Sequence, residues 1–430
     1  MEPGLQSRRT TVPQSRPDAQ CPAPAAHRPR VPVAAGTLSC PVPVFVLSIH
    51  ADYACRHRGA CCTAGWRIPV EPACEDRLVL SGLGRTRNGG RLLERDNGLT
   101  VMALAGGGAC VSFERGMGGA TSQCAIHRVL GHDALPSACQ HFPRAAVTDD
   151  LGTFVTLSHF CPTAASMLFR DDVELSIVEA PASFGSMIEY EGFDARGALP
   201  PLLAPRMLMD LESHHAWERH VVRVLADRRH TPELALERLS AHAADLRSWR
   251  PAGGSLRARI ESLGEAATDG PVDHSGARAA RTGCGFGAPA ECGAHEQASA
   301  QLERLYGVVL ACVPAGLEPD PLPRDFADTD AELVEPVWRS FAVPINRYLA
   351  ARAFASWISW QARGVVTAVA ALWAARAVLR VEAGRQCRTA GRMLDAALLV
   401  EAIRQADLLL VHKTSSRALA DRIAAVEQGR

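Results

Sequence analysis

Residues 55–66 read CRHRGACCTAGW and open a segment in which cysteines recur at short intervals. Thiolates are soft ligands that select zinc, copper(I) or iron–sulfur clusters. The adjacent Cys61 and Cys62 do not suit ordinary burial, because neighbouring side chains cannot easily face one core. The segment therefore predicts a metal or cluster site around which its loops fold. The candidate metal ligands are Cys55, Cys61, Cys62, Cys110, Cys124, Cys139 and Cys161.

Two other roles of the cysteines compete with metal binding. Disulfide frameworks staple small secreted domains, whereas this chain has 430 residues and no good signal peptide. Its early apolar stretch, Val31–Ser48, is broken by prolines, which argues against a signal-peptide core. Free cysteines that merely fill a core would be scattered, as Cys312 and Cys387 are. We therefore expect a cytoplasmic protein whose thiols stay reduced and free to bind metal.

The charge balance argues against two classes of partner. The chain carries 46 basic and 46 acidic residues, so its formal net charge is zero. Proteins that bind nucleic acid or anionic membrane surfaces usually show a basic excess or patch. The strongest later apolar run, from Gly364 to Ala375, is shorter than the roughly 20 residues that a membrane span needs. We expect neither nucleic acid nor a membrane as a partner.

The composition along the chain predicts a mainly α protein, in which an irregular cysteine-rich metal- or cluster-binding region precedes helical domains. The expected segments are a disordered N-terminal extension over 1–44, a cysteine-cluster region over 45–170, a helical hairpin region over 171–250, a flexible linker over 251–299 and a helical C-terminal domain over 300–430. Gly- and Pro-rich stretches between the cysteines predict little regular structure. Bound metal would therefore supply folding energy there.

The clearest local helix signals lie in the middle of the chain. Thr231 is a suitable N-cap, and Pro232 suits the first helical position. The apolar residues that follow repeat at a 3-4-3 spacing, which is typical of a helix face; they are Leu236, Leu239, Ala243 and Leu246. The histidines of this region are interpreted as solvated helix residues rather than ligands: His214, His215, His220, His230 and His242. The acids near the cysteine motifs, Glu114, Asp149 and Asp150, are interpreted as solvated loop positions.

Other segments receive simple structural interpretations. Val44–Ile49 is a short β-branched run that predicts a strand leading to the first ligand loop. Ser122–Leu130 predicts one or two helical turns that would bring a cysteine and a histidine to one face. The aromatic residues of Trp338–Trp360 recur at helical spacing and are expected in the core. Gly283–Gly287 resembles a phosphate-binding loop only superficially, because no strand precedes it.

Zinc and an iron–sulfur cluster are alternative occupants of the cysteine site. A cluster typically takes four thiolates, often from loops that approach from different directions. Zinc also takes four ligands and accepts imidazole nitrogen. Three histidines, His127, His141 and His159, lie two or three residues from a cysteine. We expect them to support the ligands through hydrogen bonds rather than to bind the metal.

The order of these motifs resembles the bacterial cysteine-cluster (YkgJ-like) family of zinc- or iron-chelating domains, and within it the flagellin lysine-N-methylase type. The resembling motifs are Cys61-Cys62-TAG-Trp66, Cys110-VSF, Cys124-AI-His127, Cys139-QH-Phe142-Pro143-Arg144 and Ser158-His159-Phe160-Cys161-Pro162. The match covers residues 48–250 and 300–412, and only its first block is specific. Family members commonly carry a further cysteine three residues before the Cys-Cys pair, where this chain has Arg58.

The resemblance implies a cytoplasmic protein that binds an iron–sulfur cluster, or a zinc or iron ion, through these cysteines. For the methylase type it implies methyl transfer from S-adenosylmethionine to lysine side chains of a protein substrate, with flagellin as the first candidate. The alternative is a non-catalytic protein for metal handling or redox sensing. Neither a methyl-donor pocket nor a catalytic residue can be assigned from the sequence.

Overall fold

The structure is a computed structural model that describes residues 43–83, 90–96, 98–116, 122–184, 192–265, 294–315, 317 and 320–428. All of them belong to one compact unit, Val42–Arg430. The expected N-terminal extension, apart from its last two residues, and the glycine-rich stretch Gly283–Gly287 lie outside the described residues.

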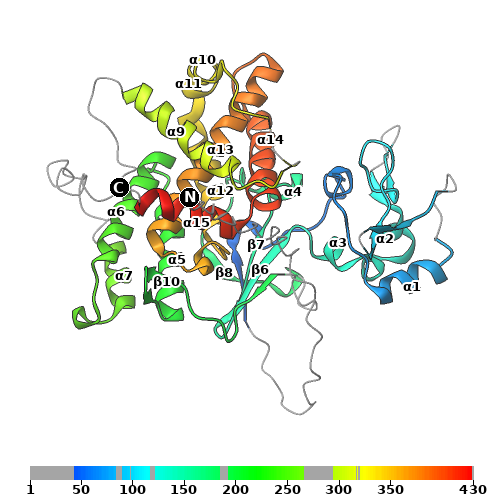
Figure 1. The fold of residues 1–430 in the computed structure, drawn as a ribbon, viewed down its shortest axis with the longest axis horizontal. Coiled ribbons are helices and arrows are strands. Elements are labelled where there is room, and N and C mark those ends of the chain that lie inside the picture. Colours follow the sequence, from blue (N-terminus) through cyan, green and yellow to red (C-terminus); the bar gives the residue numbers. More distant parts are fainter. Residues whose placement is uncertain are drawn as a thin grey trace, which may run out of the picture. The chain divides into compact units, whose positions relative to one another are not determined.

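A five-stranded mixed sheet lies at the centre of the fold (Figure 1). Its strand order is β8-β1-β7-β6-β9, and the strands are β8 Ile177–Glu179, β1 Val44–Leu47, β7 Gly152–Leu157, β6 Arg144–Asp149 and β9 Gly192–Asp194. β6 and β7 form an antiparallel hairpin, whereas β1 pairs with β7 in parallel. The short β1 confirms the strand predicted at Val44–Ile49.

The sheet corrects the predicted fold class, because the protein is mixed α/β and not mainly α with an irregular cysteine-rich region. The strands are only three to six residues long, so their alternation is too brief to stand out from the sequence. The turn between β6 and β7 is stabilised locally, because the Asp149 carboxylate accepts hydrogen bonds from the backbone N–H groups of Leu151 and Gly152.

Alternate residues of the strands face opposite sides of the sheet, as the period of two requires. Val147 and Phe154 belong to the large hydrophobic core that the helices complete. Ala146 and Val155 face a smaller core, which also contains Phe184. The end of β6, where Asp149 lies, is therefore placed against the helical core.

The cysteine segment is built from short elements with a small hydrophobic core of their own. These elements are η1 Ser48–His50, η2 Cys61–Thr63, α1 Pro72–Leu80, β2 Leu93–Asp96, β3 Leu99–Met102, β4 Phe113–Glu114, β5 Gln123–Cys124, α2 Ala125–Leu130, η3 His132–Ala134 and α3 Ser137–His141. Leu78, Met102 and Ile126 are buried in the small core. The helix predicted within Ser122–Leu130 is confirmed as α2.

The predicted helical hairpin is confirmed as α5 Leu211–Ala226 and α6 Pro232–Arg247. Thr231 caps α6, since its hydroxyl oxygen accepts the N–H of Leu234 at 3.3 Å. The four apolar residues with 3-4-3 spacing are all buried. The chain reaches this hairpin through α4 Pro162–Met167, η4 Ala182–Phe184, β10 Leu202–Ala204 and β11 Met207–Leu208.

The C-terminal part is helical, as predicted. After η5 Pro251–Gly253 the elements are α7 Leu256–Glu265, α9 Ala294–Leu310, α10 Phe326–Thr329, the π-helix η7 Asp330–Val334, α11 Glu335–Trp338, η8 Arg339–Phe341, α12 Ala342–Ala353, η9 Ser359–Gln361, α13 Val365–Ala390, α14 Ala396–Asp407, the π-helix η10 Leu408–Lys413 and α15 Ser416–Gln428. Both α7 and the start of α9 fall in the expected linker, and residues 266–293 lie outside the described part. Trp338, Tyr348 and Phe354 are buried as expected, whereas Trp357 is exposed.

The longest helix, α13, contains buried charges that are paired. Arg380 donates to the carboxylate of Asp330 at 2.5 and 2.8 Å and also to Glu335. Such pairing is needed because an uncompensated buried charge is costly. Within the described ranges, no helix combines the length and the apolar character needed to cross a membrane.

Candidate metal centre

Five of the seven candidate cysteines come together in the cysteine segment. Cys61 and Cys62 lie in η2, Cys124 ends β5, Cys139 lies in α3, and Cys110 lies in the loop before β4. The backbone joins these loops directly, because the N–H of Cys110 donates to the carbonyl oxygen of Cys62 at 2.7 Å. β4 and β5 pair Phe113 with Cys124, which brings the Cys110 and Cys124 loops together.

The five thiols, called the thiol group below, lie close enough to influence one another electrostatically. The sulfur atoms of Cys61 and Cys62 are 3.9 Å apart. The Cys62 thiol donates a hydrogen bond to Cys61. This hydrogen bond lowers the pKa of Cys61 and raises the pKa of Cys62. Burial raises the pKa of Cys139, and the charges of Cys61, Cys110 and Cys124 raise it further. Metal binding would remove these protons, because thiolates are the ligating form.

Cys55 lies beside the thiol group, whereas Cys161 packs in the smaller core of the sheet. The Cys161 sulfur is buried and lies 3.5 Å from the Tyr53 hydroxyl. Partial desolvation raises the pKa of Cys55, and the charges of Cys61 and Cys161 raise it further. Cys55 therefore lies within electrostatic range of both the thiol group and Cys161, and the prediction that all seven cysteines share one site stays a prediction.

The distances between the cysteine sulfurs can be compared with those around a bound zinc ion. Zn–S bonds of about 2.3 Å in a tetrahedral site place thiolates roughly 3.8 Å apart. In the described part of the chain, no three cysteine sulfurs lie within 4.8 Å of one another. The thiol group is therefore wider than a closed mononuclear zinc site. An iron–sulfur cluster, in which iron and inorganic sulfide lie between four thiolates, is the other candidate occupant.

Other cysteines make different contacts. Cys74 is buried in the small core and donates to the carbonyl oxygen of Ala134 at 3.4 Å. The Cys312 thiol donates to the carbonyl oxygen of Val308 at 3.2 Å within the helical part. The ten cysteines that the structure describes are all free thiols. Cys284 and Cys292 lie outside the described residues.

The histidines near the cysteines form two separate contacts. The His127 ring lies 4.8 Å from the His57 ring, measured between ring centres. His159 is fully buried and forms a pair with His50, with 3.1 Å between their Nε2 atoms. Burial and the nearby Arg352 lower the pKa of His159 to about 3, so its ring is neutral. Both contacts join one histidine to another and neither involves a cysteine, so the supporting role of the histidines stays a prediction.

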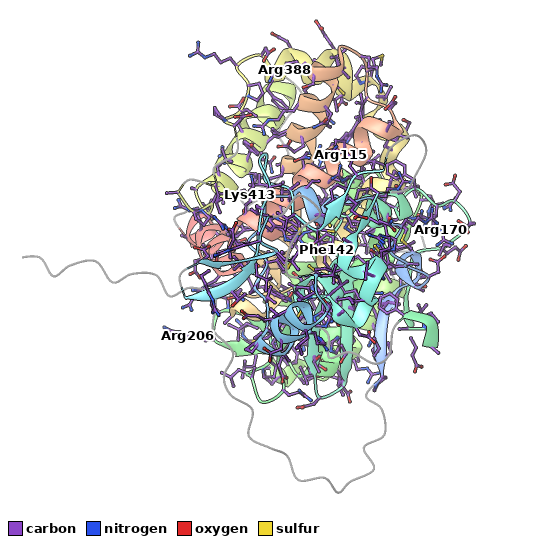
Figure 2. The ribbon with its side chains drawn as sticks, turned by 90° about the vertical axis from the view of Figure 1, so that its right-hand side faces the viewer. Arg115, Phe142, Arg170, Arg206, Arg388 and Lys413 are labelled. Atoms are coloured by element: carbon purple, nitrogen blue, oxygen red, sulfur yellow. The ribbon has the colours of Figure 1, made fainter. Side chains whose placement is uncertain are left out.

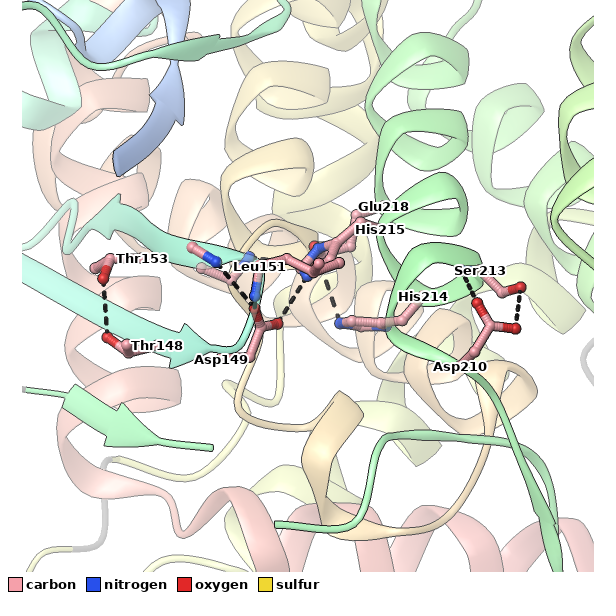
Figure 3. Close-up of polar contacts among 11 residues, drawn as sticks. Thr148, Asp149, Leu151, Thr153, Asp210, Ser213, His214, His215 and Glu218 are labelled. Carbon is pink, nitrogen blue, oxygen red and sulfur yellow. Dashed lines mark hydrogen bonds and ion pairs between the residues drawn. The ribbon is translucent and has the colours of Figure 1, made fainter. Parts of the chain in front are cut away.

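A second polar group lies where β6 meets α5 (Figure 3). His215 Nε2 lies 2.7 Å from a carboxylate oxygen of Asp149, and its Nδ1 lies 2.8 Å from Glu218. The ring of Phe154 stacks on His215 at 3.9 Å between ring centres. Asp149, predicted as solvated, is only 1% exposed.

The histidines of α5 also correct the sequence interpretation. His214, His215 and His220 are buried, and so is His230 after the helix. Their polar side chains suggested solvent, but in the folded chain carboxylates, backbone oxygens and other histidines partner them, some nearby in sequence and some brought in by packing. His230, for example, contacts the carbonyl oxygen of Val224 at 2.9 Å.

The ligand atoms of His214, His215 and Glu218 lie within 4.8 Å of one another, close enough to hold a metal ion. Both ring nitrogens of His215 already contact carboxylates, however. Burial alone would lower the pKa of His215, but the hydrogen bonds and charges of Asp149 and Glu218 raise it to about 9. The protonated imidazole therefore supplies the positive charge that the two carboxylates need, and we interpret this group as a structural ion network.

Comparisons with known proteins found no matching family model, curated protein or solved structure. The function therefore has to be argued from the cysteines and their surroundings. The thiol group is the better starting point, because its polar atoms lack the tight charge pairing of the Asp149–His215–Glu218 network.

Proposed function

We propose that this protein binds an iron–sulfur cluster through its cysteines and acts as a protein-lysine N-methyltransferase. The observation that carries the cluster is the convergence of Cys61, Cys62, Cys110, Cys124 and Cys139 from separate short elements. Four of these thiolates would hold the cluster, and Cys55 and Cys161 are the remaining candidates. The cluster would join the loops and supply redox chemistry.

The methyltransferase part of the proposal comes from the family resemblance of the cysteine motifs. S-adenosylmethionine would be the methyl donor, and a protein lysine, first of all in flagellin, would be the acceptor. Lysine must lose its proton before it can attack a methyl group. The site therefore needs a place where the amine is held close to a group that accepts a proton.

Anaerobic purification of the full chain tests the cluster. We expect a visible absorption band, with iron and acid-labile sulfide in similar amounts. Cys139→Ser should lose most of the iron, because a hydroxyl is a harder and poorer ligand than a thiolate. Cys312→Ser should keep it, since that thiol contacts a helix carbonyl. Colourless protein with stoichiometric zinc would contradict the iron–sulfur assignment.

A second candidate function is redox sensing without catalysis. The 3.9 Å separation of the Cys61 and Cys62 sulfurs favours it, because vicinal thiols so close are open to oxidation. This function predicts reversible loss of the two thiols under mild oxidant. It also predicts no binding of S-adenosylmethionine to the cluster-loaded protein, whereas the methyltransferase should bind it.

A further inference from the structure

Three aromatic rings gather beside the cysteines. Trp66, Phe142 and Phe160 each lie within four residues of a candidate ligand. The ring centre of Trp66 lies 5.4 Å from that of Phe142 and 5.2 Å from that of Phe160. Trp66 and Phe142 are half-buried, so part of this cluster faces solvent. Figure 2 labels Phe142 and, from the C-terminal part, Lys413.

An exposed histidine covers these rings. The His412 ring lies 4.7 Å from Trp66 between ring centres, and it comes from the π-helix η10 at the other end of the chain. Its Nε2 lies 2.8 Å from the hydroxyl oxygen of Ser158. That hydroxyl donates its only proton to the Asp407 carboxylate at 2.7 Å. Nε2 of His412 therefore carries a hydrogen and donates to Ser158, which leaves Nδ1 as the unprotonated nitrogen of the neutral ring.

Asp407 is a buried carboxylate with no ion-pair partner among the residues that the structure describes. It is 1% exposed, and one oxygen accepts from Ser158 and from the N–H of Phe160 at 3.2 Å. Its other oxygen, Oδ1, has no hydrogen-bond partner among the described residues, and the carboxylate forms no ion pair with any of them. Burial and the charge of Asp407 raise the pKa of Tyr348 while Arg352 lowers it, so Asp407 and Arg352 both lie within electrostatic range of Tyr348. An unpaired buried charge is costly.

The aromatic cluster already attracts one cation. The guanidinium of Arg404 lies 5.2 Å from the ring centre of Phe160, and its Nε donates to the Phe160 carbonyl oxygen at 3.0 Å. Glu401 pairs with Arg404 and offsets its charge. Among the described residues, no cationic side chain pairs with the Asp407 carboxylate or lies over the Trp66 ring.

We propose that Trp66, Phe142 and Phe160, together with Ser158 and Asp407, bind an organic cation, and that this cation is the primary ammonium of a substrate lysine. The aromatic faces would contact the methylene stem and attract the charge. Ser158 and Asp407 would receive the ammonium in place of the His412 imidazole, which now occupies this position. The exposed His412 turns toward solvent when lysine binds. The choice of lysine over other cations rests on the proposed function, whereas a cation site follows from the contacts alone.

Calorimetric titration of the full chain with N-acetyl-lysine-N-methylamide tests the site. The neutral norleucine analogue has the same stem without the ammonium, and tetramethylammonium has the charge without the stem. We expect lysine to bind roughly tenfold more tightly than norleucine, as a cation–π contact of about 1.4 kcal/mol would give. Equal affinity for lysine and norleucine would overturn the cation site, and a preference for tetramethylammonium would overturn lysine as its ligand.

Variants separate binding from folding. Trp66→Leu and Asp407→Asn should each weaken lysine binding by roughly tenfold. Trp357→Phe, at an exposed tryptophan outside the cluster, should leave it unchanged. His412→Ala should tighten binding severalfold, because it removes the present occupant from an exposed position. Weaker binding by His412→Ala would refute the displacement.

The experiment does not depend on the methyl-transfer reaction. Lysine binding without any methyl transfer would leave the cation site in place and refute the methyltransferase. Methyl transfer that persists in Trp66→Leu, with unchanged dependence on substrate concentration, would refute the cation site and leave the methyltransferase in place.

Discussion

His215 shows how one side chain makes this core sensitive to pH. Its pKa is raised to about 9 in the folded protein, against about 6.5 for an ordinary histidine. A raised pKa contributes stability that is fully present below the unfolded value and is lost as the pH rises through the folded value. The Asp149 and Glu218 carboxylates behave oppositely, since their pKa values are lowered and their contribution is lost toward acid pH.

We predict that His215→Leu lowers the free energy of unfolding by on the order of 3 kcal/mol at pH 7. The penalty should shrink by most of that amount at pH 10, where His215 of the native protein has also lost its proton. Urea unfolding at the two pH values measures it. Arg219→Ala, at an exposed position of the same helix, should show no such dependence, and a penalty independent of pH would contradict the charge assignment.

At the scale of secondary structure elements, the cysteine segment and the helices are stabilised by different interactions. The segment has a small core and short strands, whereas α5, α6 and α13 belong to the large core. The main cross-link available to the segment is the proposed cluster. Metal binding energy is folding energy when the ligands come from loops that would not otherwise converge.

We predict that anaerobic removal of the metal by a chelator increases amide hydrogen exchange in the cysteine segment. The increase should cover η2, β5, α3 and the Cys110 loop before β4, because these carry the proposed ligands. Exchange in α5, α6 and α13 should stay nearly unchanged, which provides an internal control. Uniform protection before and after chelation would show that the metal does not stabilise the segment.

The start of α13 depends on a glycine. Gly364 has φ of +96°, and a Cβ atom there would lie 2.9 Å from the carbonyl oxygen of Leu203. Gly364→Ala should therefore destabilise the protein by roughly 2 kcal/mol in urea unfolding. Gly307→Ala is a matched control, because its exposed site in α9 is open and a helical alanine stabilises by about 0.5–1 kcal/mol. Equal effects of the two variants would contradict this account.

At the scale of the whole molecule, the two ends of the described chain meet at one place. His412 and Asp407 of the C-terminal helices contact Trp66 and Ser158 of the first half. The proposed cluster and the proposed lysine site are therefore neighbours. Such proximity is needed if the cluster organises the substrate site.

We predict that cells lacking this gene lose methyl-lysine from at least one protein, with flagellin tested first. Wild-type protein should restore the modification and Cys139→Ser should not, because the cluster is lost. Mass spectrometry of partner proteins measures it. Lys413 is the single lysine of the chain, so Lys413→Arg provides a protein that cannot methylate itself. Full methylation with Cys139→Ser would leave the cluster without a role in the reaction.

Local signals determined the parts of the fold that depend on nearby residues. Thr231 and Pro232 predicted the start of α6, since a cap and its helix lie within four residues of each other. The cysteine spacing likewise singled out the loops that converge, because each cysteine motif is a short run of consecutive residues. The aromatic spacing placed Trp338 and Tyr348 in the core but misplaced Trp357, since periodicity does not say where a helix ends.

Only the tertiary structure decided the sheet, the buried ions and the contacts on which the proposed lysine site rests. β1 pairs with β7 across about a hundred residues of chain, and no local pattern specifies such a partner. His215 was interpreted as solvated because only one of its carboxylates, Glu218, lies on its own helix, whereas Asp149 comes from β6, 66 positions away in the chain. Ser158 meets Asp407 across 249 positions. Burial and charge pairing are properties of neighbours in space, so residues that are distant in sequence become a site only when the chain is folded.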